Sequence, residues 1–386
     1  MCVKRVVPFG KPILGDAEKL AVMAVLDGPV LVHGPRVKQF EADFSAWTKA
    51  PHSLAVGSCT AGLHLFWFDL GIGPGDEVIV PAQTHSATAH AVEYTGASCV
   101  FVDCDPSTGN ISVDALEAAV TPRTRGISLV HFLGLPADMD GINSIALKHG
   151  LPVLEDCALS IGATYKGKHT GLLGDAGVFS FYPVKHMTTA EGGMFITRHE
   201  DLAGRIGKKR AFGVDRVVGE RSVPGVYDVT MLGYNYRMNE IEGAIGIEQL
   251  KRMDGFLDKR RENYLALAAG LQPLDELRVL ESHGTAEVKG SHYCLSVVLE
   301  PDLRPKRFEL VQALNAKGVG TSVYYPRPVP HMTYYRDKYG HSEASFPNAA
   351  VISYGSIALP VGPHLTLEDM SYIVDAMKQA LSEVKG

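Results

Sequence analysis

The sequence predicts an α/β protein with a large domain built on a mostly parallel mixed sheet and a smaller α+β domain at its C-terminal end. The chain has 386 residues, 46% of them hydrophobic, which is enough for a large core and two domains. Short β-branched runs alternate with helical patterns through the first two-thirds, as is typical of a parallel sheet covered by helices. This pattern changes near residue 255, so we place the domains at 1–254, N-terminal segment included, and 255–386.

The large domain is predicted from short apolar runs separated by helical patterns. Each run has the length and the β-branched content of a buried strand. The strands are expected at 77–80, 98–102, 126–132, 152–155, 177–181 and 193–197. Apolar residues at helical spacing predict helices at 113–120 and 140–149.

The smaller domain is predicted from a basic helical stretch followed by alternating and helical segments. The expected elements are a helix over 251–270, a strand at 291–299, a helix near 307–317 and a strand at 321–325. A last helix over 366–385 begins with TLED, a capping-box pattern. Two stretches rich in glycine or proline, 28–35 and 325–331, are expected to be loops.

Composition argues against several classes of function. The formal net charge is −6 and both signs are mixed along the chain, which gives no electrostatic footprint for nucleic acid or an anionic membrane. No apolar run has the length of a transmembrane helix, and no signal-peptide pattern follows the first residues. The six cysteines include no CxxC pair, so we expect free buried thiols, no metal site and a cytoplasmic protein.

The segment 174–193, GDAGVFSFYPVKHMTTAEGG, places a lysine just after an apolar strand. Lys185 follows Phe181 and Tyr182, which could wall the loop. A lysine amine joins an aldehyde cofactor only when it can be neutral and held still, and such a loop provides both conditions. Ser180 has a hydroxyl that could reach a phosphate. The alternative is an ordinary surface lysine on a flexible loop.

A second segment, 152–163 (PVLEDCALSIGA), ends an apolar strand with a carboxylate. Asp156 occupies the place where open α/β sheets bind ligands, and it could pair with a protonated pyridine nitrogen. The small Ala158 would let a flat ring lie close to the backbone. The alternatives for Asp156 are a helix N-cap or a metal or ribose ligand.

A third segment, 57–65 (GSCTAGLHL), leads directly into an apolar helix. The amides of Thr60 and Ala61 would form an anion site at the start of that helix, although capping by Ser58 or Thr60 explains the segment equally well. A helix N-terminus, a strand-end aspartate and a lysine after a strand follow one another along the chain. These are the three contacts that pyridoxal 5′-phosphate (PLP) requires.

Seven blocks, spread over nearly the whole chain, carry a family resemblance. They are GPRVKQFEADF (34–44), SCTAGLHL (58–65), PAQTHSATA (81–89), EDCA (155–158), SFYPVKHMTTAEGG (180–193), GYNYRMNEIEGAIG (233–246) and LPVGPHLT (359–366). In order and spacing they resemble the DegT/DnrJ/EryC1/StrS family of PLP-dependent aminotransferases that act on keto sugars. The resemblance implies PLP-dependent transferase fold type I, the fold of aspartate aminotransferase, and a homodimer with active sites at the subunit interface.

Carried over position by position, the resemblance implies roles for individual residues. Lys185 would bind the cofactor as a Schiff base and then act as general base and acid. Asp156 would hold the pyridine nitrogen in its protonated form. The groups expected on the phosphate are Thr60, Ala61, Ser180 and, from the neighbouring subunit, Asn235.

Two positions depart from the usual pattern of the family. His85 stands where Trp, Phe or Tyr commonly stacks on the cofactor ring; a neutral imidazole can also stack, and a helix-cap role is the alternative. Leu159 stands where Gln or His commonly lies near the phenolic oxygen of the cofactor, and leucine cannot hydrogen-bond. A dehydratase subgroup has histidine at the lysine position, whereas here His186 is only adjacent to Lys185, which favours amino transfer.

The resemblance implies transfer of an amino group from L-glutamate, through pyridoxamine phosphate (PMP), to a keto sugar by a ping-pong mechanism. The expected acceptor is a nucleotide-linked 4-keto- or 3-keto-deoxysugar, used in the synthesis of O-antigen or another polysaccharide. Candidate acceptor contacts, each with a structural alternative, are Tyr325, Arg327, His331 and, for an anionic group, Arg237. The rival interpretations are a sugar dehydratase, a keto-inositol aminotransferase and a PLP-binding regulator without turnover.

Overall fold

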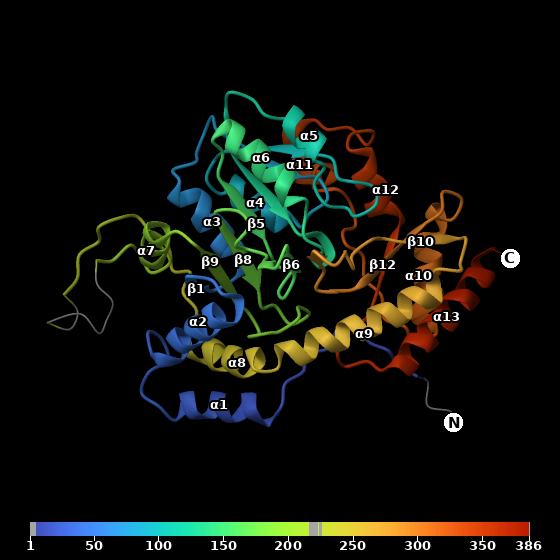
Figure 1. Ribbon diagram of the computed structural model, residues 1–386, viewed down its shortest axis with the longest axis horizontal. Helices are drawn as coiled ribbons and strands as arrows, with labels where there is room; N and C mark the ends of the chain where they lie inside the picture. The colour runs from blue at the N-terminus through green and yellow to red at the C-terminus, as the bar shows by residue number, and fades with distance from the viewer. Residues whose placement is uncertain (1–4, 216–222, 224–225, 386) are drawn as a thin grey trace.

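A seven-stranded sheet forms the centre of the computed structural model, which describes residues 5–215, 223 and 226–385 (Figure 1). The strands lie in the order β1-β9-β8-β5-β4-β2-β3, and only β9 runs antiparallel to its neighbours. They are β1 (His52–Val56), β2 (Glu77–Pro81), β3 (Ser98–Val102), β4 (Thr124–Val130), β5 (Val153–Asp156), β8 (Ala176–Ser180) and β9 (Gly193–Thr197). The six predicted strands are confirmed. The sequence HSLAV of β1 was missed because its two polar residues weaken the apolar signal, and its pairing with β9 defines it instead.

Helices cover both faces of this sheet, and alternate strand residues point to opposite cores. In β8, Val178 packs with α3 (Cys59–Asp69) and Phe179 packs with α2 (Pro35–Thr48). Two further helices on the α3 side are α4 (Ser86–Glu93) and α7 (Glu200–Lys209). Those on the α2 side are α5 (Val113–Ala118), α6 (Met139–His149) and α8 (Glu240–Leu250), with α1 (Asp16–Leu26) packed on α8.

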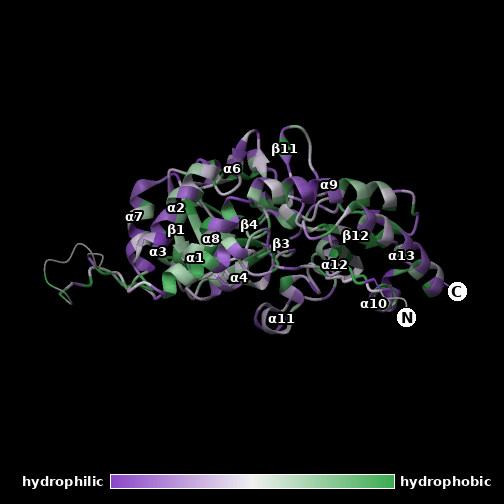
Figure 2. Ribbon diagram, turned by 90° about the horizontal axis from the view of Figure 1, so that it is seen from below, coloured by the Kyte–Doolittle hydropathy of each residue, from purple (hydrophilic) through white to green (hydrophobic). Residues whose placement is uncertain are grey.

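The C-terminal region has its own antiparallel sheet, of β10 (Leu277–Val279), β12 (Leu295–Leu299) and β13 (Ser356–Leu359). Three helices enclose a separate apolar core with it: α9 (Met253–Leu271), α10 (Arg307–Ala316) and α13 (Leu367–Lys385). Helix α9 runs from beside α8 to this small sheet (Figure 1). The predicted cap of α13 is confirmed, since Thr366 and Asp369 exchange side-chain and backbone hydrogen bonds. Much of the hydrophilic colour lies on the outward sides of α7, α9 and α13 (Figure 2).

Shorter elements join the two regions. A three-stranded sheet combines β6 (Thr164–Tyr165) and β7 (Lys168–His169) with β11 (Val288–Lys289) from the C-terminal part of the chain. Helices α11 (Thr333–Tyr339) and α12 (Pro347–Gly355) complete the described helical segments, apart from short 3-10 turns.

No helix among the described residues is long and apolar enough to cross a membrane.

The predicted strand at 321–325 is wrong. Only Ser322 pairs with the small sheet, through a single bridge to Ala358. Beyond it the chain leaves the sheet edge, and Tyr324 and Tyr325 pack into an apolar cluster between the two regions. Burial of these rings therefore replaces the continued pairing that the alternating pattern predicted.

The division at 254/255 stays a prediction. Helix α9 crosses that point without a break. Val7, near the start of the described chain, pairs with Val319 and lies in the C-terminal core. In the opposite direction, Tyr335 of α11 packs against Phe101 of β3. Each region therefore contains a piece of chain from the other half.

Candidate active site

The three segments singled out in the sequence meet at the C-terminal ends of the central strands of the large sheet. β5 ends at Asp156 and β8 ends at Ser180. Gly193 pairs with Ser180, and a Cβ added to Gly193 would lie 2.7 Å from the backbone nitrogen of Cys59, the first residue of α3. The Cys59 sulfur lies 3.8 Å from Asp156 Oδ1. The close approach that glycine permits thus places the α3 N-terminus beside both strand ends.

Asp156 is almost completely buried and is held by donors on both of its oxygens. The Thr88 hydroxyl donates to Oδ2 at 2.7 Å, and the Ala158 backbone N–H donates to Oδ1 at 3.0 Å. Because residues 157–163 form turns rather than a helix, the N-cap alternative for Asp156 is wrong. The Cys59 thiol also lies within donating distance of Oδ1, whereas Oδ2 accepts only from Thr88 and retains capacity for a hydrogen bond from a ligand.

Lys185 lies on the loop after β8, with its amine turned inward. Its backbone N–H donates to the Tyr182 carbonyl at 2.9 Å, and its Nζ lies 5.3 Å from the centre of the Tyr293 ring. Burial lowers the pKa of the Lys185 amine, and the nearby charge of Asp156 opposes that change. The surface-lysine alternative is therefore wrong, since this amine is enclosed and loses its proton more readily than a solvated one.

The N-terminus of α3 combines a cap with free helix amides. The Ser58 hydroxyl accepts from the Ala61 N–H at 3.1 Å, so the capping alternative is confirmed for Ser58. The first intrahelical bond to Ser58 comes from Gly62, which leaves the Thr60 amide without a helical acceptor. Such a terminus suits a phosphate, and Ser180 lies at the end of the strand next to it.

His85 and Tyr325 meet on another side of the same site. His85 caps α4, because its Nδ1 accepts from the Ala87 N–H at 3.1 Å, and in the neutral ring Nε2 then carries the hydrogen. Its ring centre lies 5.4 Å from that of Tyr325 in an edge-on arrangement. Leu159 belongs to the same buried apolar cluster as Tyr325. The capping alternative for His85 is thus confirmed, and its ring is also available to a cofactor.

The other candidate residues lie in different surroundings. His331 is buried, with Nε2 donating to the Ser345 carbonyl at 2.9 Å and Nδ1 accepting from the Tyr354 hydroxyl at 3.2 Å, so both ring nitrogens are used within the protein. Its structural alternative is the better description. Arg327 is exposed. Asn235 is also exposed, and it pairs with Ala211 beside the end of β1.

Arg237 lies close to the α3 end of the site. It forms a bridge with Val56, the last residue of β1, and its guanidinium lies 5.1 Å from the centre of the Phe212 ring. The Gly57 N–H donates to the Tyr236 carbonyl at 2.7 Å. The 235–237 segment therefore runs alongside the approach to Ser58 and α3.

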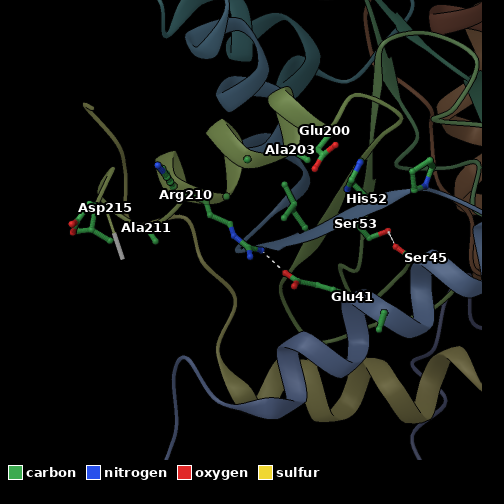
Figure 3. A pocket seen from close by; sticks show the side chains of 16 residues that line it. Glu41, Ser45, His52, Ser53, Glu200, Ala203, Arg210, Ala211 and Asp215 are labelled. Carbon is green, nitrogen blue, oxygen red and sulfur yellow. Dashed lines mark hydrogen bonds and ion pairs between the residues drawn. The ribbon is translucent and has the colours of Figure 1, made fainter. Parts of the chain in front are cut away.

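A surface hollow of about 600 Å³ between α2, β1 and α7 does not include the predicted catalytic residues (Figure 3). Two of its charged side chains form an ion pair. Arg210 donates to Glu41 at 2.5 Å, and the same Glu41 oxygen accepts from the Ala55 N–H at 2.8 Å. The described residues that line this hollow include none of the groups predicted to hold the cofactor.

Sequence patterns did not identify several residues that shape the site. Thr88 contacts Asp156 from α4, and Thr84 contacts Thr88. Tyr293, beside Lys185, comes from the segment before β12. For Thr84 and Thr88 the sequence does contain a signal: two threonines four residues apart, at the start of a helix that follows a strand. Nothing local in the sequence pointed to Tyr293.

The residues present fit PLP. Helix amides and a hydroxyl suit a phosphate dianion, a buried carboxylate suits a protonated ring nitrogen, and an enclosed amine of lowered pKa suits an aldehyde. The glycine at 193 leaves room for the backbones to approach each other where these groups meet. This donor set therefore supports the cofactor that the sequence predicts.

Comparisons with known proteins agree with this geometry. The model of the DegT/DnrJ/EryC1/StrS aminotransferase family matches residues 12–378. The spore coat polysaccharide biosynthesis protein SpsC of Bacillus subtilis is 39% identical over 383 residues, which cover 98% of this chain and 97% of SpsC.

Solved structures show the same fold. The putative sugar aminotransferase Spr1654 of Streptococcus pneumoniae in its PMP form superposes with a TM-score of 0.93, at 28% identity, over 98% of this chain and 100% of that one. DesV of S. venezuelae, in complex with a ketimine intermediate, has a TM-score of 0.88 at 31% identity, over 97% of this chain and 99% of that one. The predicted fold type I and the predicted PLP cofactor are confirmed. The chain belongs to the DegT/DnrJ/EryC1/StrS aminotransferase family and is a PLP-dependent aminotransferase.

Proposed function

We propose that this enzyme moves an amino group from L-glutamate to the keto group of a nucleotide-linked 4-keto- or 3-keto-deoxysugar. The observation that carries the proposal is the convergence of Lys185, Asp156 and the α3 N-terminus at one sheet edge. The names of its relatives support a sugar as acceptor, and that of SpsC supports a polysaccharide precursor as product. Transfer proceeds in two half-reactions with ping-pong kinetics.

The chain's own residues bind and orient the cofactor in this proposal. The phosphate is held by the amides of Thr60 and Ala61 and by the Ser180 hydroxyl. The Ala61 amide gives up its hydrogen bond to the Ser58 hydroxyl in order to bind the phosphate. His85 lies against the face of the ring, and Ala158 lets the ring approach the β5 end. When bound, PLP supplies an electron sink for the carbanion that forms at the amino-bearing carbon.

Lys185 and Asp156 perform the proton chemistry. The Lys185 amine, made less basic by burial, would take the proton from the α-carbon of the donor and deliver it two atoms away, to the cofactor carbon on the other side of the shared nitrogen. Asp156 holds the hydrogen on the pyridine nitrogen. Tyr325 closes one side of the site, because its ring is buried beside His85. The proposed acceptor contacts are Tyr325, Arg327 and Arg237. His331 is not among them, because both of its ring nitrogens bond within the protein.

The assembly in this proposal is a homodimer in the cytoplasm, with Asn235 reaching the phosphate of the neighbouring subunit. Asn235 is exposed, as a residue that serves a partner must be. Several large apolar side chains are exposed on α1 and on the segments 30–32 and 226–232, which would suit an interface: Leu20, Met23, Leu26, Val30, Leu31, Val226, Val229 and Leu232. Light scattering after gel filtration tests the dimer, and an Asn235→Ala variant with weakened PLP binding supports the shared site.

Release of 2-oxoglutarate tests the substrates. PLP-loaded protein is incubated with L-glutamate and a panel of nucleotide-linked keto-deoxysugars, free keto sugars and a keto-inositol. Stoichiometric 2-oxoglutarate and an aminated nucleotide sugar would support the proposal. An aminated keto-inositol would support the cyclic-ketone alternative. A deoxygenated sugar that carries no amino group, formed with release of ammonia, would support the dehydratase. The family match sets aside the regulator without turnover.

A further inference from the structure

Thr84 and Thr88 form a buried pair of hydroxyls that ends on Asp156. The Thr88 hydroxyl lies 2.7 Å from Asp156 Oδ2, and the Thr84 hydroxyl lies 2.8 Å from that of Thr88. Both threonines are fully buried, so water does not compete for these bonds. We propose that this pair is a positioning device that orients Asp156 and keeps the shared proton on the pyridine nitrogen of the cofactor.

The direction of the hydrogen bonds follows from the number of hydrogens. An ionised carboxylate only accepts, so Thr88 donates its single hydroxyl hydrogen to Asp156. Thr88 has no second hydrogen for Thr84, and Thr84 must therefore donate to Thr88. The chain of donors runs from Thr84 to Thr88 to Asp156, and its last bond has a charged acceptor, which makes it stronger than a neutral one.

The position of Thr88 in α4 strengthens this interpretation. A threonine in a helix commonly donates its hydroxyl to the carbonyl four residues earlier, which here belongs to Thr84. Thr88 instead donates across to β5. Its β-branched side chain has few rotamers, so the direction of the hydroxyl is fixed by the helix. Because His85 is the N-cap of α4, the same turn of the helix also places the imidazole ring of His85 beside the site.

The consequence concerns the proton between Asp156 and the ring nitrogen. Each hydrogen bond to a carboxylate favours its charged form. With Thr88 on one oxygen and the Ala158 amide on the other, the charge remains on Asp156 and the proton remains on nitrogen. Removing the Thr88 hydroxyl takes away the donor on Oδ2 and frees the carboxylate to rotate. Protonation of the nitrogen then becomes incomplete, and the electron sink becomes weaker.

The inference rests on the proposed role of Asp156, and NMR of protein loaded with PLP labelled with ¹⁵N in the ring tests the two separately. We expect Thr88→Val, which keeps the shape, to move the ring-nitrogen signal toward that of neutral pyridine and to weaken PLP binding about tenfold. Thr88→Ser, which keeps the hydroxyl, should behave like the wild type. Thr84→Val should give a smaller change in the same direction.

An unchanged ring-nitrogen signal in Thr88→Val, with Asp156→Asn giving a moved signal, would overturn the inference and leave the role of Asp156 intact. An unchanged signal in Asp156→Asn would contradict the proposed role of Asp156 itself. If Thr88→Val does not fold, Thr84→Val decides, because it removes the hydroxyl that donates to Thr88 and should still move the ring-nitrogen signal in the same direction. A wild-type signal in Thr84→Val would then overturn the relay.

Discussion

Glu155 and Asp156 are adjacent buried carboxylates at the end of β5, but their surroundings differ. Glu155 accepts four hydrogen bonds, two on each oxygen. The donors are the backbone N–H groups of Gly171, Leu173 and Gly174 at 2.6, 2.8 and 2.6 Å and His131 Nε2 at 2.8 Å. Asp156 accepts one strong bond on each oxygen. The first carboxylate is saturated, whereas the second retains room for a ligand.

This difference separates a structural carboxylate from one that can still bind a ligand. Glu155 ties the end of β4, through His131, to the 171–174 loop that precedes β8. His131 Nδ1 accepts from the Ala137 N–H at 3.1 Å, so Nε2 carries the hydrogen and the ring is neutral. His131, Glu155 and Cys157 have ligand atoms within 4.8 Å of one another, but hydrogen bonds already occupy the histidine and carboxylate. The cluster therefore holds the loop in place and offers no open metal site.

The largest expected effect concerns Lys185, on the side of the site where Asp156 can still bind a ligand. If the chemistry takes place there, Lys185→Ala should lower the rate of the half-reaction with L-glutamate by about 10⁴-fold, since it removes the group that moves the proton. Stopped-flow absorbance measures this rate. Lys185→Arg is the matched control, because it keeps a cation and loses the neutral amine. A rate in either variant within tenfold of the wild type would contradict the assignment of Lys185.

A paired substitution tests the comparison itself. Asp156→Asn should reduce the half-reaction by about 10²-fold or more while leaving the folded protein intact, because an amide cannot stabilise the protonated ring nitrogen. Glu155→Gln should instead lower the free energy of unfolding by about 3 kcal/mol, since its amide group would face N–H donors. Urea unfolding of the apoprotein and turnover of the loaded protein separate these effects. A reversed pattern would show that the two carboxylates have been assigned the wrong roles.

Part of the acid sensitivity should arise beside Glu155. His169 of β7 is buried, and burial lowers its pKa to about 4, compared with an ordinary value of 6.5. Between these values the unfolded chain binds a proton that the folded protein does not, so stability falls as the pH falls from 6.5 to about 4. The loss should reach about 3 kcal/mol. Urea midpoints across this range measure it.

His169→Gln provides the control for this pH dependence. The His169 Nε2 accepts from the Gly162 N–H at 2.9 Å, and Nδ1 donates to the Thr170 carbonyl. Glutamine has both a donor and an acceptor but does not titrate. The variant should therefore show a flatter decline in stability between pH 6.5 and 4. An unchanged slope would place the acid-sensitive group elsewhere.

The smallest expected effects concern His85, which has two separable parts. His85→Asn keeps a side-chain acceptor for the Ala87 N–H and removes the ring, so PLP affinity should fall less than tenfold with stability retained. His85→Phe keeps a ring and removes the cap, so stability should fall by about 1 kcal/mol with PLP affinity retained. Fluorescence titration and thermal unfolding measure these changes. If both variants lose only stability, the ring of His85 does not contact the cofactor.

Sequence alone predicted the sheet, and with it the positions of Asp156 and Lys185, because both follow apolar strands whose signal is local. It could not predict the neighbours of these residues. Thr88 reaches Asp156 from a helix 68 positions earlier in the chain, and Tyr293 reaches Lys185 from the C-terminal region. The predicted strand at 321–325 failed for a related reason, since its aromatic residues pack between the two regions. Contacts between distant segments left no periodic pattern to read.

The attachment site of the cofactor tests the central claim most directly. PLP-loaded protein is reduced with borohydride, which makes the bond between the lysine and the cofactor permanent, and its peptides are analysed by mass spectrometry. The account predicts one cofactor per chain, on the peptide that contains Lys185, and no label on that peptide in Lys185→Ala. Label on another lysine, or stable cofactor binding with no reducible bond, would contradict the site described at the ends of β5 and β8.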